Sequence, residues 1–133
     1  MFIIDLSIGG SGTQPPPRTN VDRGVLELTR NLMTRLLDTA RNSSSSDAEL
    51  IYNALSYMHG ASQARNITDN LSRAREIWAE QAINNAPQNT QEMLRRIRYE
   101  LHRTESNPEM AERIEDQIGA LMRNIQILPG YRR

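Results

Sequence analysis

The strongest constraint on the fold is an apolar stripe near the carboxyl end of the chain. Its residues follow one another at intervals of four, four, three, four and three: Met110, Ile114, Ile118, Leu121, Ile125 and Leu128. Such intervals place side chains on one face of an α-helix. Asn107 and Pro108 stand where a helix begins, and Pro129 and Gly130 stand where it ends. This stretch is therefore predicted to be a helix whose stripe needs a matching surface.

Further segments show helical periodicity. Helices are expected over residues 21–42, 47–59, 69–84 and from 89 or 90 to 104. The second of these is predicted to begin with a capping box between Ser46 and Glu49 and to end at Gly60. The third is predicted to bury a stripe around Ile77 and Trp78. The fold class predicted is all-α, with about five amphipathic helices in a small bundle and an extended or flexible N-terminal arm.

A short connection joins the last two predicted helices, so they are expected to be antiparallel neighbours. Their stripes are then predicted to face each other, with Leu94, Ile97 and Leu101 of the first against the last helix. The last stripe is longer by about one turn. Its end is therefore predicted to contact the helix at 21–42, the N-terminal arm or another protein chain through Leu121, Ile125 and Leu128.

Residues 1–20 are expected to form an arm and a Pro/Gly linker ahead of a helical domain at 21–128 and a basic tail at 129–133. The arm begins with an apolar patch containing Phe2, Ile3 and Ile4. This patch suits either an edge strand that docks on a partner or a loosely packed arm. The Ser, Thr, Gln and Pro that follow also resemble an export leader that is recognised unfolded.

The charged residues balance, with 16 basic and 16 acidic side chains and a sequence pI of about 6.7. This is not the basic excess typical of a dedicated nucleic-acid binder. All the basic residues are arginines. The absence of lysine has two explanations: compositional bias of the lineage, or avoidance of the ε-amino group that accepts ubiquitin. The second would suit a viral protein or a bacterial effector inside a host cell.

The predicted helix at 90–104 carries the main candidate for a binding site. Arg95, Arg98 and His102 share one line of this helix, and Arg96, Tyr99 and Arg103 share the next. Guanidinium groups beside an aromatic ring are suited to gripping phosphates. Two glutamates reduce the charge of the segment, however, and predict weak, salt-sensitive binding. A solvated face or a protein contact is the alternative interpretation.

Reactive groups are few. The chain has two histidines and no cysteine, and it lacks a phosphate-binding glycine loop. The acidic residues of the last helix are expected on its solvated face: Glu109, Glu112, Glu115 and Asp116. We therefore expect no catalytic residue, cofactor, metal or small-molecule substrate. No apolar run is long enough to span a membrane and no secretory signal is recognisable, which predicts a cytoplasmic protein, including the cytoplasm of a host cell.

These observations together predict a non-enzymatic helical module that binds other proteins and self-associates, such as an adaptor, a secreted effector or a virion-associated protein. The alternative is a helical dimer that binds RNA or DNA through the arginine-rich helix.

Overall fold

The computed structural model describes residues 20–59, 69–104 and 106–131, and these residues form helices without any strand. The helices are α1 (Asn20–Arg41), α2 (Ser45–His59), α4 (Asp69–Asn85), α5 (Gln88–Arg103) and α6 (Pro108–Gln126). Their bounds lie close to those expected from periodicity. The all-α prediction is confirmed, whereas the arm at 1–19 and the expected cap at Gly60 lie outside the described residues.

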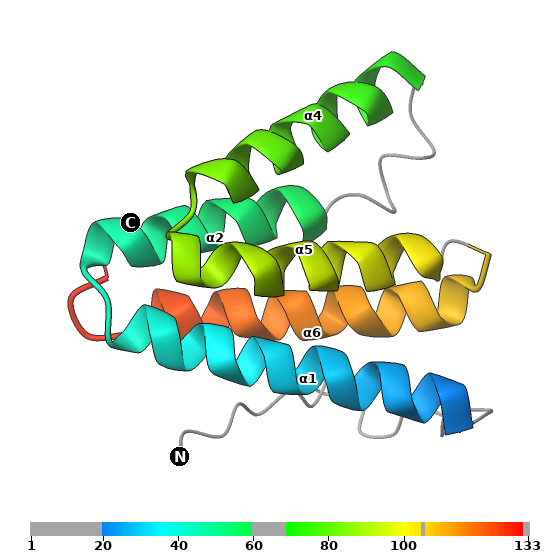
Figure 1. Cartoon of the computed structure of the whole chain (residues 1–133), viewed down its shortest axis with the longest axis horizontal. Coiled ribbons are helices and arrows are strands. Elements are labelled where there is room, and N and C mark those ends of the chain that lie inside the picture. Colours follow the sequence, from blue (N-terminus) through cyan, green and yellow to red (C-terminus); the bar gives the residue numbers. More distant parts are fainter. Residues whose placement is uncertain (1–19, 60–68, 105, 132–133) are drawn as a thin grey trace.

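The helices form a bundle in which α1, α5 and α6 run alongside one another (Figure 1). The most extensive helix contacts join α1 to α6, α2 to α4 and α2 to α6. α4 meets α5 at the short link after Asn85 and diverges from it toward its own amino end (Figure 1). α1 touches α2, α5 and α6.

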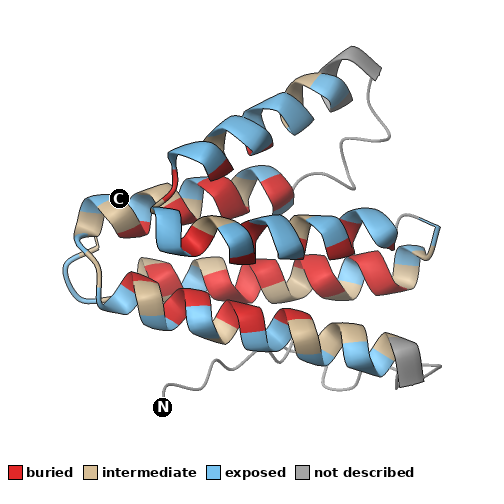
Figure 2. Cartoon of the chain, in the orientation of Figure 1, coloured by how far each residue is buried: buried red, intermediate tan, exposed pale blue. Residues whose placement is uncertain are grey.

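The core is formed mainly by α1, α2 and α6, with one face of α5 completing it (Figure 2). Burying large aliphatic side chains stabilises a domain by about 1.5–3 kcal/mol for each one. The largest side chains that are fully buried are Met33, Leu36, Leu37, Ile51, Leu55, Met58, Ile83, Leu94, Ile97, Ile114 and Ile118. Both predicted stripes, on α5 and on α6, are therefore core stripes.

The expected partner of the α6 stripe was only partly right. α6 packs mainly against α1 and α2, and its contact with α5 is much smaller. Leu121 and Ile125, predicted to reach beyond the neighbouring helix, are completely buried within the chain. Leu128 is half-buried against the same core. α1 and α2 together supply the surface that α5 does not, so the α6 stripe is covered without a second chain.

The predicted stripe of α4 was wrong in its register around the helix. Ile77 and Trp78 are exposed by 56% and 44%, and the buried residues of α4 are Ala79 and Ile83, with Ala86 buried in the link that follows. α4 packs chiefly on α2, and its small alanine side chains let the two helices approach closely. Ile77 and Trp78 are consequently turned out of the core, whereas Ile83 is buried in it.

The helix ends are stabilised by side-chain caps. Asn107 accepts a hydrogen bond from the main-chain nitrogen of Met110 at 3.3 Å, and Pro108 is the first residue of α6, as predicted. At α2 the prediction was wrong by two residues. Ser44, rather than Ser46, accepts from the main-chain nitrogen of Asp47 at 3.2 Å.

Residues 127–131, which follow α6, fold back on the bundle. The ring of Tyr131 lies 5.9 Å from that of Tyr52 on α2, measured between centroids. The hydroxyl of Tyr52 also accepts a hydrogen bond from Gln126 at 2.8 Å. Residues up to Tyr131 are therefore packed against the helical domain. None of the helices in the described part of the chain combines the length and the apolar character needed to cross a bilayer.

We expect Leu121→Ala to lower the free energy of unfolding by about 2–5 kcal/mol, because it leaves a cavity in a fully buried site. The matched variant Ile127→Ala truncates a residue that is 75% exposed, and it should change the same quantity by less than about 0.5 kcal/mol. Urea unfolding followed by circular dichroism measures both. Equal losses in the two variants would contradict the assignment of Leu121 to the core.

Candidate interaction surface on α4 and α5

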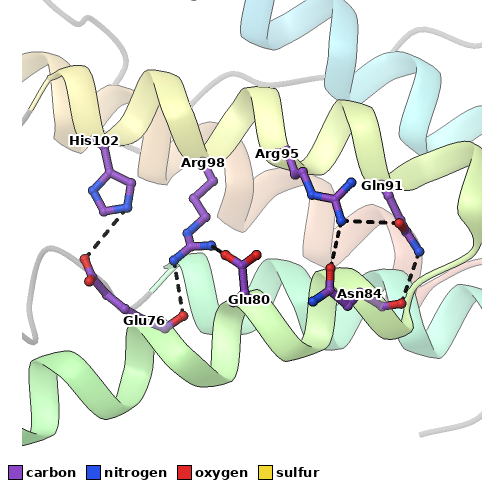
Figure 3. A network of polar contacts seen from close by, with 7 residues as sticks. All are labelled: Glu76, Glu80, Asn84, Gln91, Arg95, Arg98 and His102. Carbon is purple, nitrogen blue, oxygen red and sulfur yellow. Dashed lines mark hydrogen bonds and ion pairs between the residues drawn. The ribbon is translucent and has the colours of Figure 1, made fainter.

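α5 is amphipathic, and its polar side divides into two faces. Residues three and four apart share a face of a helix, so Arg95, Arg98 and His102 are separated from Arg96, Tyr99 and Arg103. The first set points toward α4 (Figure 3). The second set is exposed to solvent. The structure thus separates residues that the nucleic-acid hypothesis had grouped together.

The face toward α4 forms a polar seam between the two helices (Figure 3). Arg98 lies at its centre and donates to a carboxylate oxygen of Glu80 at 2.5 Å and to the main-chain oxygen of Glu76 at 3.2 Å. The imidazole of His102 lies 3.8 Å from the carboxylate of Glu76. The side chain of Arg98 is only 19% exposed, so α4 withdraws most of this cation from solvent.

The other end of the seam is close to the α4–α5 link. Arg95 donates to the side-chain oxygen of Asn84 at 2.7 Å (Figure 3). Gln91 donates to the main-chain oxygens of Asn84 and Ala86 at 3.1 and 2.9 Å. Ion pairs at an exposed position are worth about 0–1 kcal/mol each. The seam therefore orients α4 on α5 rather than providing most of the stability of the contact.

Sequence analysis missed this seam, although a signal was present. Glu76, Glu80 and Asn84 recur every four residues on α4. Their partners follow on α5 at intervals of three and four residues in the reverse order, as antiparallel helices require: Arg95, Arg98 and His102. Complementary polar residues three or four apart share one face of each helix, so on consecutive helices they predict such a seam.

The other polar side of α5, which we call the outer face, consists of Glu92, Arg96, Tyr99 and Arg103. All four are exposed, Tyr99 by 54%. The guanidinium carbons of Arg96 and Arg103 lie 5.6 and 5.7 Å from the centroid of the Tyr99 ring, within the range of a cation–π contact. The outer face is thus an ordered array of charged and aromatic groups.

Glu100 lies behind the outer face and is almost completely buried, at 1% exposure. Its carboxylate is 3.3 Å from the guanidinium of Arg96 and 3.4 Å from that of Arg103. A buried carboxylate is costly unless it is paired with a cation. Glu100 and the two arginines therefore hold one another in place. Glu92 lies four residues before Arg96, yet in the described part of the chain it forms no ion pair.

A second exposed feature is the aromatic edge, formed by Tyr57 of α2 and Trp78 of α4. The ring centroids are 6.3 Å apart and the planes are inclined by 49°. Tyr57 is 36% exposed and Trp78 is 44% exposed. The edge results from the orientation of α4 that sequence periodicity did not predict. The alanines at 79, 82 and 86 were the available signal for a small-residue contact with α2.

The remaining predicted site residues do not form a common surface. The protein-contact residues of the arm lie outside the described residues: Phe2, Ile3 and Ile4. Leu121 and Ile125 are in the core, so they offer no exposed contact area. On α6, Glu115 is buried rather than solvated as expected. Within the described ranges, no group of three or more histidine or acidic side chains is arranged to hold a metal ion.

A cleft of about 470 Å³ lies between the α1–α2 link and the chain end after α6. Residues 43–45 line one wall and residues 128–131 line the other, with Arg41 as the charged side chain of the lining. The cleft is therefore formed by the packing of the chain end beside the link, apart from both α4 and α5.

No protein-family model matches the chain, and comparisons with the curated proteins and with the solved structures find no significant match.

Replacing both Arg96 and Arg103 by alanine is expected to lower the free energy of unfolding by about 3 kcal/mol, because Glu100 would remain buried without a cation. Each single replacement leaves one arginine in place and should cost about 1 kcal/mol or less. The double variant should therefore lose more than the sum of the two singles. Urea unfolding of the three variants measures this.

The matched control is Arg30→Ala with Arg35→Ala, which removes two exposed arginines of α1. Adding Glu100→Gln to the Arg96/Arg103 double variant should restore part of the lost stability, because a neutral amide costs less to bury than a carboxylate. Purely additive losses, or no recovery on adding Glu100→Gln, would show that the three side chains do not act as a unit.

Proposed function

We propose that this chain is a non-enzymatic helical module that binds other proteins through exposed faces of its helices. The observation that carries the proposal is the aromatic edge, where Trp78 remains 44% exposed while its ring contacts that of Tyr57 at a tilt. Tryptophan and tyrosine are among the residues most enriched at the energetic centres of protein interfaces. Their large rings provide contact area at little cost in conformational entropy.

The packing of the core supports this proposal. The apolar stripes of α1, α5 and α6 are covered within the chain, and Leu121 and Ile125 are completely buried. Trp78 is not among the residues that form this core. A large aromatic residue that folding leaves on the surface of a helix is available for a contact with another molecule. The contact with the ring of Tyr57 restrains this side chain before any partner binds, which lowers the cost of ordering it.

The alternative, binding of duplex RNA or DNA, has weaker support. Of the arginines on which that hypothesis depends, Arg95 and Arg98 donate to residues of α4. Arg96 and Arg103 face outward, but both lie beside the carboxylate of Glu100. Cations that are already engaged imply few phosphate contacts, and the affinity for a duplex should fall steeply with salt.

The working environment proposed is the cytoplasm, either of the producing cell or of a host. An adaptor, a secreted effector and a virion-associated protein all suit a small helical binding module. The lysine-free sequence favours a host setting, because a chain without ε-amino groups offers no lysine for ubiquitin attachment.

The test is affinity capture with the full-length chain from cells that naturally contain it, followed by quantitative mass spectrometry. Trp78→Ala should reduce recovery of the specific partner by at least about tenfold, the loss expected for a hot-spot residue. Ile127→Ala, which truncates an exposed residue elsewhere, should retain it. Thermal unfolding of each variant checks that the fold is intact. Equal capture by all three proteins would contradict a binding role for the aromatic edge.

Binding of a duplex RNA at about 50 and 200 mM salt separates the two hypotheses. We expect no saturable binding at either concentration. Saturable binding at the lower concentration that disappears at the higher one would instead favour the nucleic-acid alternative.

A further inference from the structure

The residues of the outer face of α5 have the spacing found where two helices pack side by side. Glu92, Arg96, Tyr99 and Arg103 are separated by four, three and four residues and all point to solvent. Alternating intervals of three and four keep side chains on the line where one helix meets another. In the core such positions hold aliphatic residues, whereas here they hold charged and aromatic ones. The outer face therefore suits a polar partner whose charges complement its own.

The charge pattern is complementary to itself when the helix is reversed. In an antiparallel pair of α5 helices related by a two-fold axis level with residues 97 and 98, residue 92 of each copy lies opposite residue 103 of the other. In the same register residue 96 lies opposite residue 99. Glu92 then meets an arginine, and Arg96 meets the ring of Tyr99. Every member of the outer face thus gains a partner of suitable chemistry.

We propose that the outer face of α5 is a docking surface for a second copy of this chain, in this antiparallel arrangement. The proposal rests on the proposed interaction function and names one partner for it. It explains why Glu92 is left without an ion pair in the described structure, although Arg96 lies four residues away. Arg96 and Arg103 are instead held by Glu100, which presents them outward in a fixed arrangement.

The size of the outer face sets the expected strength of the dimer. α5 has 16 residues and is therefore about 24 Å long. A single helix pair of this length buries less than the roughly 1,200–2,000 Å² of a standard stable interface. The dimer should be weak and should dissociate on dilution. It should also weaken with added salt, because the contacts between residues 92 and 103 are ion pairs near the surface.

Sedimentation equilibrium of the full chain over about 10 µM to 1 mM tests the proposal, since dissociation constants in this range are expected of a small polar interface. The average mass should rise from 15.2 kDa toward twice that value. Glu92→Arg places arginines opposite each other at both symmetric contacts and should weaken association at least about fivefold. Glu92 is exposed, so this substitution should leave the fold unchanged.

The matched control is Glu49→Arg, which makes the same change of charge at an exposed position of α2. It should associate like the unmodified chain. Adding Arg103→Gln to Glu92→Arg removes the repulsion across the two-fold axis and should recover part of the affinity, while Arg96 still pairs with Glu100. Recovery of this kind identifies residue 103 of the second copy as the neighbour of residue 92.

Three results would overturn the dimer: a chain that stays monomeric at 1 mM, a Glu92→Arg variant that associates unchanged, or equal weakening by Glu49→Arg. These results are distinct from a failure of the proposed function. Capture of a partner through Trp78 uses α2 and α4, so Glu92→Arg should leave it unaffected. Conversely, if affinity capture recovers no partner, the proposed function fails, but the average mass measured by sedimentation should still rise with concentration.

Discussion

Burial of the aliphatic stripes between α1, α2 and α6 is the interaction on which the rest of the structure depends. Side chains such as Leu36, Ile118 and Leu121 are completely removed from solvent there. Because this burial is accomplished within one chain, the bundle does not need a partner to cover its α6 stripe. The surfaces of α4 and α5 are then free to carry polar and aromatic groups, and those surfaces hold the proposed interaction sites.

α5 connects the core to the surface. Its apolar face, with Leu94 and Ile97, completes the core, and its polar side is divided by the position of α4. The seam toward α4 engages Arg98, whereas Arg96 and Tyr99 remain outside. One arginine-rich helix therefore has two polar sides: one orients a neighbouring helix of the same chain, and the other is exposed to solvent.

The candidate site was predicted in composition but not in arrangement. Periodicity correctly separated Arg95, Arg98 and His102 from Arg96, Tyr99 and Arg103, because side-chain direction along a helix follows from residue spacing alone. It did not reveal that α4 covers the first set, since this depends on the angle between two helices. The same limit explains why Trp78 was expected in the core. Both sides of α4 carry apolar residues, and the side that packs on α2 is the one with Ala79 and Ile83 rather than the one with Ile77 and Trp78.

The sequence by itself determined the helical class, the approximate helix bounds and the start of α6 at Asn107 and Pro108, because these follow from local spacing and capping chemistry. Only the tertiary structure decided which stripes meet, that Leu121 and Ile125 are buried within the chain, and which arginines face solvent. The physical reason is that a stripe records which side of a helix avoids water. Which neighbour covers that side depends on packing among several helices that are far apart in sequence.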